Sequence, residues 1–291
     1  MSRCLIVYFS QGGTTALVAE HIASGLRGSE YEVDLYNIGE GAPAALDGYD
    51  LLGVGMPVYY YRPPFNIADY LESLPPLEGL PFFAFVLHGT YRFDAGTAVR
   101  RSLAGKGGRE VGYFHSYGVE RWVGYLNEGY LFSPNHPGDG ELSRAVAFGR
   151  EVAAHAAGRQ YDRPPDDAPP SLVYRAERFL TNRWLAEHLY SRLFRVDAAK
   201  CNSCGVCFDR CPNGNISRDR NGRPVWGRNC LMCMMCEVDC PQRAITSPAS
   251  WAVFRPIMKF NASRASGDPV IDHARIDRKT WQPLDSSGGE A

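Results

Sequence analysis

The sequence has 291 residues, of which 45% are hydrophobic and 22% are charged, and its formal net charge is -1. This length favours two domains, with a small third unit possible, and the composition excludes a wholly disordered, fibrous or coiled-coil chain. The charge balance gives no overall field that would attract nucleic acid or an anionic membrane. All apolar runs are too short to span a bilayer. We therefore expect a soluble protein with no nucleic-acid partner and no membrane span.

The N-terminal segment has one basic residue and a short apolar run, which ends before Gln11, Gly12 and Gly13. A signal peptide would continue its apolar stretch at this point and lead to a small-residue cleavage site. We therefore expect a buried strand at the start of the chain and a cytoplasmic protein.

Residues 1–158 alternate short apolar runs with helical stretches. Strands are predicted at 3–9, 31–36, 51–55, 82–87 and 110–117, because each of these runs suits a sheet buried on both faces. Helices are predicted at 15–26, 65–73, 95–104 and 141–157. This alternation is typical of an α/β domain with a five-stranded parallel sheet and helices on both of its faces.

A loop rich in glycine and hydroxyl groups follows the first predicted strand and leads directly into a helix. It consists of Ser10, Gln11, Gly12, Gly13, Thr14 and Thr15. Hydroxyls, accessible backbone and the free N–H groups of a helix start are suited to binding a phosphate. The loop has no lysine and is not Gly-x-Gly-x-x-Gly, which disfavours a P-loop NTPase and a dinucleotide fingerprint. A phosphomonoester such as that of FMN fits better, although any tight strand-to-helix turn can use glycine and threonine.

Two further loops follow the third and fourth predicted strands. The carboxyl ends of parallel strands meet at one edge of a sheet, where open α/β sheets bind ligands. Aromatic side chains there can stack on an isoalloxazine ring, and backbone groups can bond its polar edge. The alternative is that the tyrosines are ordinary surface and packing residues. The predicted ring-binding residues are Pro57, Val58, Tyr59, Tyr60, Arg62, His88, Gly89, Thr90, Tyr91 and Phe93.

Residues 159–195 predict a connection between domains. Its first part is poor in apolar residues and carries four prolines, which predicts an extended linker. Residues 171–195 place apolar side chains on one face of a helix and arginines on the other. We expect this amphipathic helix to dock on a neighbouring domain rather than on a membrane surface.

Residues 196–250 contain an internal repeat. An offset of 29 relates six residues of the first half to residues of the same type in the second half. The cysteine spacing matches that of bacterial two-cluster ferredoxins, in which the fourth cysteine of each motif ligates the other [4Fe–4S] cluster. One predicted ligand set is Cys201, Cys204, Cys207 and Cys240, and the other is Cys230, Cys233, Cys236 and Cys211.

Zinc and disulfides are the alternatives for these cysteines. Zinc closes its tetrahedron with four ligands and does not require a doubled repeat with a proline after each fourth cysteine. Disulfides are disfavoured in a reducing cytoplasm. Because a unit of about 50 residues has a marginal core, the clusters should also stabilise its fold. Cys4 stands alone on the first strand, and we expect it to be a small buried apolar residue.

Residues 251–291 are mostly polar and end in a segment rich in serine and glycine. We expect an irregular tail that packs through Trp251, Phe254 and Trp281 and frays from about residue 286.

The first 158 residues resemble a flavodoxin, and the chain to about residue 250 resembles the proteins that fuse a flavodoxin-like domain to a two-cluster ferredoxin, the EFR-type ferredoxins. Flavodoxins commonly show Ser/Thr-x-Thr-Gly-Asn-Thr in the phosphate loop, and here Gly12 and Thr14 depart from that pattern. The resemblance implies a flavodoxin-like, doubly wound, five-stranded parallel sheet over 1–158, a helical linker over 159–195, a small α+β ferredoxin domain over 196–250 and a tail over 251–291.

We therefore predict an electron-transfer protein that carries FMN and two [4Fe–4S] clusters and exchanges electrons with another redox protein. One alternative is an FMN-dependent reductase of a small organic substrate fed by the clusters, with His88, Tyr91 or His115 as a possible acid. A second is a partner-docking ferredoxin whose flavodoxin-like domain lacks a cofactor. The fold alone does not separate these functions.

Overall fold

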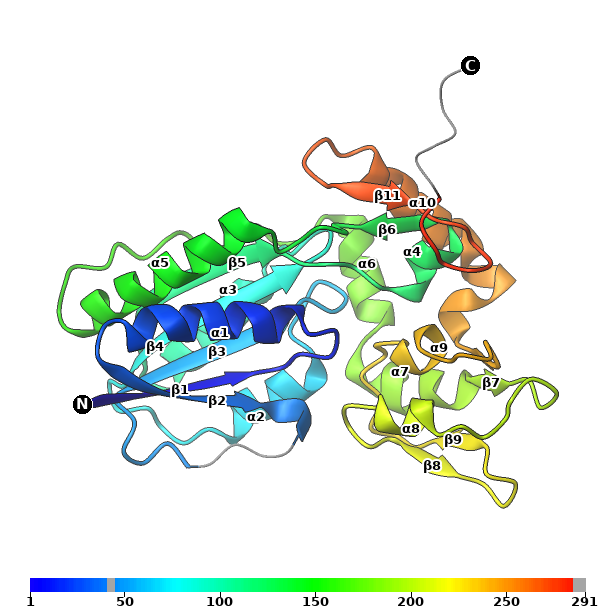
Figure 1. Ribbon diagram of the computed structural model, residues 1–291, viewed down its shortest axis with the longest axis horizontal. Helices are drawn as coiled ribbons and strands as arrows, with labels where there is room; N and C mark the ends of the chain where they lie inside the picture. Colours follow the sequence, from blue (N-terminus) through cyan, green and yellow to red (C-terminus); the bar gives the residue numbers. More distant parts are fainter. Residues whose placement is uncertain (41–44, 285–291) are drawn as a thin grey trace. The chain divides into compact units, whose positions relative to one another are not determined.

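The structure of the protein is a computed structural model, and it describes residues 1–40 and 45–284 (Figure 1). The chain divides into two compact units that interleave along the sequence. The first unit consists of Met1–Gly118 and His136–Asn182, and the second of Val119–Asn135 and Arg183–Ala291. The ranges expected from the sequence assign 119–135 to the first domain, whereas the structure includes this segment in the second unit.

The first unit is built on a five-stranded parallel sheet with the strand order β2-β1-β3-β4-β5. Its strands are β1 (Ser2–Tyr8), β2 (Tyr31–Asn37), β3 (Leu51–Pro57), β4 (Pro81–His88) and β5 (Arg109–Tyr117). The helices are α1 (Thr14–Arg27), η1 (Ile38–Glu40), α2 (Phe65–Ser73), α3 (Ala95–Gly105) and α5 (Asp139–Ala156). The predicted strands and the predicted fold class, a doubly wound five-stranded parallel sheet, are confirmed.

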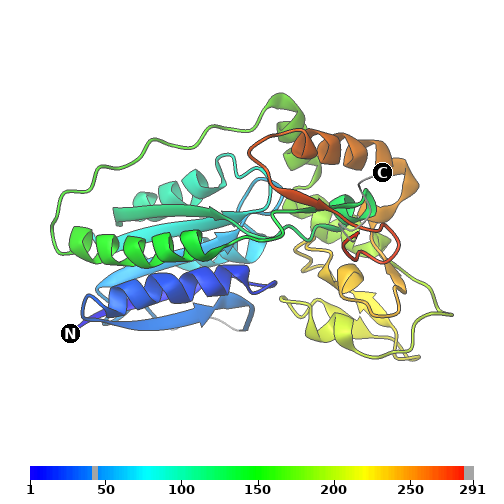
Figure 2. The same cartoon turned by 45° about the horizontal axis from the view of Figure 1, so that its top comes forward.

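Neighbouring residues of β5 show that helices cover both faces of the sheet (Figure 2). A Cβ on Gly112 would lie 2.6 Å from a methyl group of Val152 in α5. The next residue, Tyr113, brings its hydroxyl to within 2.0 Å of the position that a Cβ on Gly96 of α3 would take. Because successive strand residues point to opposite faces, α5 and α3 lie on opposite sides of the sheet.

Helices α1 and α5 lie side by side on one face, and two glycines allow their close approach. A Cβ on Gly25 would lie 2.1 Å from the carbonyl oxygen of Val146, and one on Gly149 would lie 2.2 Å from that of Ile22. No larger residue fits at either position without moving a backbone. This packing holds the C-terminal half of α1 against α5.

The Pro-rich segment after α5 is held along the first unit. The side chain of Arg100 in α3 is fully buried and donates to Glu110 of β5 at 2.8 Å. Its remaining nitrogens donate to the carbonyl oxygens of Pro164 at 2.8 Å and Pro165 at 3.2 Å. The guanidinium also lies 4.6 Å from the centre of the Tyr113 ring.

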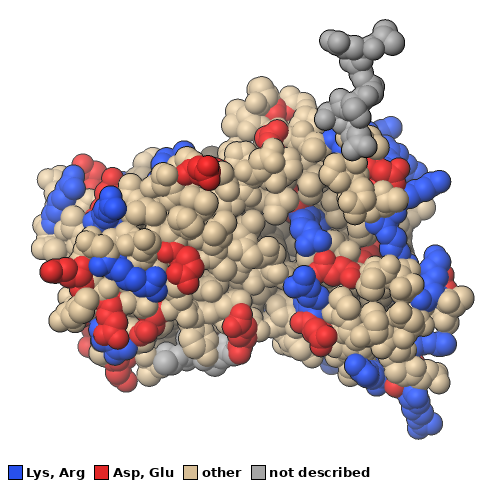
Figure 3. Space-filling model, in the orientation of Figure 1, with Lys and Arg blue, Asp and Glu red and all other residues tan. Residues whose placement is uncertain are grey.

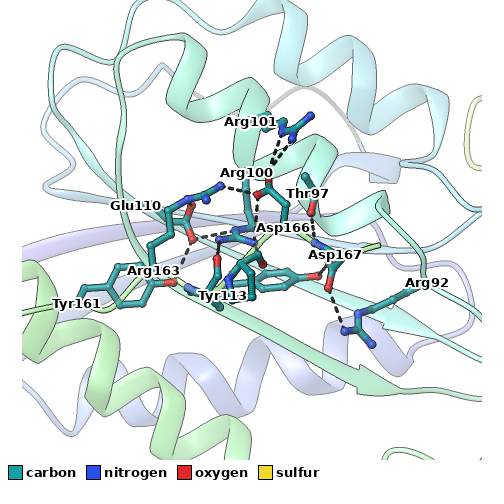
Figure 4. A network of polar contacts seen from close by, with 12 residues as sticks. Arg92, Thr97, Arg100, Arg101, Glu110, Tyr113, Tyr161, Arg163, Asp166 and Asp167 are labelled. Carbon is teal, nitrogen blue, oxygen red and sulfur yellow. Dashed lines mark hydrogen bonds and ion pairs between the residues drawn. The ribbon is translucent and has the colours of Figure 1, made fainter. Parts of the chain in front are cut away.

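Asp167 fixes the same segment at a second point (Figure 4). Its carboxylate accepts from Arg92 at 3.0 Å and from the hydroxyl of Tyr113 at 2.6 Å, and its backbone N–H donates to Thr97 at 2.8 Å. We call residues 159–170 the strap, because these contacts bind an extended chain to α3 and β5. The sequence predicts the extended conformation but not its attachment.

The single helix expected over 171–195 is wrong, because the structure forms α6 (Leu172–Leu180), α7 (Arg183–His188) and a short 3-10 turn, η2 (Tyr190–Leu193). The break has a local cause. Thr181 donates its hydroxyl to the carbonyl of Glu177 at 2.8 Å, and Asn182 donates its amide to that of Phe179 at 2.7 Å, so polar side chains satisfy the last turn of α6.

The expected docking of this region through its apolar stripe is also corrected. Within α6 the residue that is buried is Tyr174, at 2% exposure, whereas Leu172 is 80% and Phe179 is 72% exposed. Helix α6 therefore packs through its tyrosine face rather than through its most hydrophobic side chains.

The second unit contains the repeat predicted from the cysteine motifs. Its elements are β7 (Arg195–Val196), α8 (Val206–Asp209), β8 (Ile216–Arg218), β9 (Pro224–Trp226), α9 (Met235–Val238) and β10 (Ile245–Thr246). Strand β7 pairs with β10, and β8 pairs with β9, both antiparallel. Left-handed backbone recurs at the repeat distance, at Ser203 and Met232 and again at Gly205 and Met234. The two halves thus share their turns as well as their cysteines.

The irregular tail expected after residue 250 is wrong for the described residues. The region forms η3 (Pro248–Ser250), η4 (Ala252–Phe254), α10 (Arg255–Ser266) and β11 (His273–Arg275). Pro256 lies in the first turn of α10, where its missing N–H costs nothing. Strand β11 pairs antiparallel with β6 (Tyr130–Phe132), which follows α4 (Val123–Asn127). The fraying expected from residue 286 lies outside the described residues.

Within the described ranges, no helix combines the length and the hydrophobicity that crossing a membrane requires.

Candidate functional site

The candidate phosphate loop connects β1 to α1. Gly13 adopts a left-handed conformation, with φ 89°, and α1 begins at the next residue. A Cβ added at Gly12 or Gly13 would meet no described heavy atom within 4 Å, so the space over the loop is open. The Ser10 hydroxyl is buried and has no hydrogen-bond partner in the described part of the chain. An unpaired buried donor beside a helix N-terminus and open space fits a phosphate group.

Side-chain contacts join this loop to its neighbours. The carbonyl of Ser10 accepts from the side-chain amide of Asn37 at 3.3 Å, and the oxygen of the Gln11 side chain accepts from the Tyr59 hydroxyl at 2.9 Å. Thr15 is buried at the start of α1. The structure therefore brings the predicted phosphate loop and the loop after β3 together.

The loop after β3 contains a tight two-residue turn with unusual side chains. The backbones of Tyr59 and Arg62 exchange hydrogen bonds of 3.0 and 3.1 Å. Between them, Tyr60 has φ 48° and Tyr61 has φ 62°. Two consecutive positive φ angles in such turns are normally left to Asn and Gly, so two tyrosines there store strain. Strain of this kind is concentrated at functional sites. The first residue of the loop, Val58, donates to the carbonyl of Leu87 at 2.8 Å and so ties the loop to β4.

His88 ends β4 and faces β5. One ring nitrogen, Nδ1, lies 2.9 Å from the carbonyl of Thr90, and the ring centre lies 4.5 Å from that of Tyr117. Burial lowers the pKa of His88 to about 4, so the imidazole is neutral near pH 7. Burial also lowers the pKa of His115. The two histidines are therefore poor proton donors at neutral pH.

The remaining predicted ring contacts gather around a residue that sequence reasoning missed. Tyr174 of α6 lies with its ring centre 4.8 Å from Tyr61, 5.6 Å from Tyr91 and 5.2 Å from Phe93. No sequence signal relates a tyrosine on an amphipathic helix to loops some 80 to 110 positions earlier.

Arg62 also turns toward α6. It donates to the carbonyl of Arg178 and lies 3.2 Å from the Thr181 hydroxyl. Burial, followed by repulsion from Arg178, lowers its pKa to about 10, which leaves it charged at neutral pH. Contacts of Arg62, Tyr91 and Phe93 with a flavin ring stay a prediction.

The eight clustered cysteines line two separate cavities in the second unit. Each cavity receives three cysteines from one motif and the fourth from the other. Cys201, Cys204, Cys207 and Cys240 line the first, and Cys211, Cys230, Cys233 and Cys236 line the second. Cys4, by contrast, is fully buried in the core of the first unit, and burial raises its pKa.

Backbone N–H groups donate to the cysteine sulfurs at corresponding points of the repeat. Asn215 donates to Cys211 at 3.2 Å, and Ala244, 29 positions later than Asn215, donates to Cys240 at 3.3 Å. Such donors stabilise negative charge on sulfur, and in iron–sulfur proteins they tune the reduction potential.

Without metal, burial raises the pKa of Cys207 to about 11 and that of Cys230 to about 12. These thiols are protonated at neutral pH, and a metal that binds them must release their protons. No three His, Cys, Asp or Glu side chains within residues 1–40 and 45–284 converge on one point where a single ion would bind. A cubane cluster needs no such convergence, because its four cysteines each bind a different iron.

Two family models match the chain. The model described as "Flavodoxin domain" matches residues 5–118, and the model described as "4Fe-4S dicluster domain" matches residues 189–245. The first match covers β1 to the end of β5 and contains the candidate phosphate loop. The second contains all eight clustered cysteines.

Three similar proteins show how the likeness divides along the chain. An uncharacterised protein of Methanocaldococcus jannaschii is 26% identical over 165 residues, which are 52% of this chain and 97% of that protein. The pyruvate synthase subunit PorD of the same organism is 40% identical over 58 residues, 19% of this chain and 67% of the subunit. Among solved structures, oxidised Flavodoxin 2 from Bacillus cereus is 20% identical, with a TM-score of 0.42, over 53% of this chain and 99% of that one.

Proposed function

The chain is a flavodoxin–ferredoxin fusion, and we propose that it relays electrons between FMN bound in its first unit and two [4Fe–4S] clusters bound in its second. The observation that carries this proposal is the presence, in one polypeptide, of two crossed sets of four cysteines and of an open phosphate loop with an unpaired buried hydroxyl. When bound, FMN exchanges two electrons and can pass them on singly, whereas a cluster carries one. A chain that holds both cofactors can therefore couple two-electron to one-electron carriers.

The residues proposed to hold FMN come from the loops that follow β1, β3 and β4, and the first two of these loops carry the supporting geometry. Ser10, the backbone of Gly12 and Gly13, and the first turn of α1 are suited to the phosphate, since they offer donors and open space. The strained turn at Tyr60 and Tyr61 places aromatic side chains and backbone groups beside this loop. These features support the predicted FMN site.

The cluster ligands are proposed to be the two cysteine sets that line the two cavities. A donor set made only of sulfur suits iron–sulfur clusters or zinc, and the doubled, crossed arrangement favours the clusters over zinc. Backbone N–H groups donate to Cys211 and to Cys240 at equivalent positions of the repeat, so the two clusters would have similar hydrogen bonds. The other side chains that line the two cavities differ. The difference in side chains allows different potentials for the two clusters.

The proposed partner is another redox protein. The relative PorD, which is similar to residues of the second unit, is named as a subunit of pyruvate synthase. This likeness supports exchange of electrons between the ferredoxin unit and a larger oxidoreductase. Reduction of a small substrate at the flavin is less well supported, because burial lowers the pKa of both His88 and His115 and so disfavours the protonated imidazolium that would act as the acid.

Cofactor content and electron flow test the proposal together. Anaerobically prepared protein should contain about eight irons and eight sulfides per chain, together with one FMN. Stoichiometric zinc with negligible acid-labile sulfide would exclude the clusters. The protein is then mixed rapidly with a reduced external ferredoxin while the flavin absorbance is followed.

The informative variant replaces Cys230, Cys233 and Cys236 with Ser, and Cys4→Ala serves as the matched control because Cys4 lies outside both cavities. Flavin reduction should be slowed strongly in the triple variant and be unchanged in the control, at equal flavin content. Equal rates in the triple variant and the wild type would show that the clusters do not feed the flavin, and the reductase alternative would then lead.

A further inference from the structure

A second kind of cavity lies within the second unit, away from the cysteine ligands. It has a volume of 460 Å³, a size typical of small-molecule sites. Three arginines line it, Arg243, Arg255 and Arg278, and its apolar wall includes Trp251 and Met258. In the part of the chain that the structure describes, none of its lining residues is a cysteine. Figure 3 shows basic side chains gathered on the surface around α10, the helix that begins at Arg255.

A buried carboxylate positions two of these arginines. The side chain of Glu128 is only 6% exposed, and it accepts from Nε of Arg255 at 3.1 Å and lies 3.9 Å from Nη2 of Arg278. The side chains of Arg255 and Arg278 are themselves 62% and 49% exposed. The terminal nitrogens of Arg255 have no partner among the described residues, so the anchored guanidinium keeps donors for a ligand.

The other carboxylate of the cavity is already satisfied. Glu237 accepts from the backbone N–H of Ser247 at 2.8 Å and from the hydroxyl of Ser250 at 2.5 Å. Three arginines therefore face two carboxylates, both of which are occupied by hydrogen bonds. A further cation, Lys259, lines the adjoining cavity of 370 Å³ together with Arg255 and Arg278.

The buried side-chain atoms of the cavity that have no partner among the described residues are donors. Besides the arginines, the indole N–H groups of Trp251 and Trp281 are buried and have no acceptor within the described ranges. Arg243 lies 4.2 Å from the centre of the Trp281 ring and donates to the carbonyl of Lys279, so its guanidinium is held against the wall. A ligand that completes this site must bring acceptors and negative charge, and its apolar part can lie on the tryptophan wall.

We propose that this cavity binds a small organic anion whose phosphate or carboxylate group pairs with Arg255 and Arg278. Guanidinium groups bind either anion with two parallel hydrogen bonds, and the concave apolar wall at Trp251 and Met258 favours a ligand with a carbon skeleton over an inorganic ion. Ile245 lines both this cavity and the cavity of the Cys201 set. The anion would therefore bind beside the proposed first cluster, in a different unit from the flavin.

Isothermal titration of the FMN-saturated, cluster-loaded protein at low salt tests the proposal. Bound FMN keeps the phosphate loop of the first unit from binding the probes, and unbound FMN is removed before the titration because it belongs to the proposed ligand class. The probes are AMP, which has a phosphate and a ring, citrate, which has carboxylates, and adenosine, which has the ring without the charge. AMP or citrate should bind at one site, and the one that binds identifies the anionic group. Adenosine should bind at least about tenfold more weakly than AMP.

Arg278→Gln is the decisive variant, because it removes one cation of the cavity while Glu128 keeps its closer partner, Arg255. It should weaken binding at least about tenfold, and Arg243→Gln should do so as an independent check. Arg220→Gln is the matched control, since Arg220 is an exposed arginine of the same unit that does not line the cavity. Binding of neither anion by the wild type, equal affinity for adenosine and AMP, or equal losses in Arg278→Gln and Arg220→Gln would overturn the proposal.

Discussion

The two units of this protein are stabilised by different means. In the first, all residues but one are buried in β3 and in β4, and the largest fully buried side chains include Phe82, Phe83 and Phe85 of β4. In the repeat of the second unit, which is described throughout, no helix exceeds four residues and no strand exceeds three. The first unit is therefore held by a hydrophobic core that its sequence supplies directly, whereas the repeat of the second unit would rely on the clusters that we propose its cysteines bind.

The backbone of the second unit is strained at the turns that carry its cysteines. Ser203, Met232 and Met234 all have positive φ angles, a conformation that costs non-glycine residues about 1 kcal/mol or more. Each lies next to, or one residue from, a clustered cysteine, so the strained turns direct sulfur atoms into the two cavities. Cluster binding is expected to offset this strain.

The largest expected effect is therefore the loss of the clusters. Removing iron with a chelator under anaerobic conditions should unfold the repeat of the second unit, because metal binding contributes on the order of 10 kcal/mol to small metal-dependent domains. Hydrogen exchange should show lost protection over residues 195–246 and unchanged protection over β1, β3 and β4. Retained protection in the iron-free repeat would show that the second unit does not depend on clusters for its fold.

The strap offers a test of the first unit that is independent of metal. Arg100→Ala removes a fully buried guanidinium and its bonds to Glu110, Pro164 and Pro165, and it should destabilise the first unit by about 3 kcal/mol. Arg101→Ala is the control, because Arg101 is 70% exposed and its ion pair should contribute less than about 1 kcal/mol. Urea denaturation followed by flavin release measures the difference. Similar effects of the two substitutions would show that the buried contacts do not hold the strap.

Gly13 tests the open loop of the first unit. Gly13→Asp adds a carboxylate at a residue whose φ is 89°, and it should weaken FMN binding at least about 100-fold because like charges meet at the phosphate. Gly13→Asn tolerates the left-handed conformation and adds no charge, so it should lose much less affinity. Flavin fluorescence titration gives both values, and iron content should stay constant. Full flavin occupancy in Gly13→Asp would show that the phosphate binds elsewhere.

A further expected effect concerns acid stability. The pKa of His88 is lowered to about 4 by burial, so the unfolded chain binds a proton that the folded one refuses between pH 6.5 and 4. The stability of the first unit is thus complete above pH 6.5 and falls by about 3 kcal/mol as the pH drops toward 4. Arg92, His115 and Asp167 act on the same ring electrostatically.

His88→Gln should flatten this part of the pH profile in urea denaturation, and His21→Gln, on the surface of the same unit, should not. An unchanged slope in His88→Gln would assign the acid sensitivity between pH 6.5 and 4 to other groups.

Local sequence patterns were sufficient to predict the elements that one clear pattern marks. The strands of the sheet are continuous apolar runs, and the cysteine spacing directly determines the turns around the two cavities. Contacts between distant segments gave no such signal. Arg100 resembles a solvated helix residue until Pro164 and Pro165 cover it, and β11 pairs with β6 from more than 130 positions earlier. The candidate site loops could be predicted because the carboxyl ends of parallel strands meet at one edge of the sheet. The position of Tyr174 beside those loops could be seen only in the folded chain.

The most direct test of the electron relay is whether the rate of electron transfer between cluster and flavin depends on the protein concentration. The fully oxidised holoprotein is given one electron by a flash-generated reductant, and the flavin and cluster absorbances are followed at several protein concentrations. The account predicts a first phase that depends on concentration, followed by electron movement between cluster and flavin at a rate that does not. A second phase whose rate rises in proportion to protein concentration, or no exchange at all, would contradict an intramolecular relay.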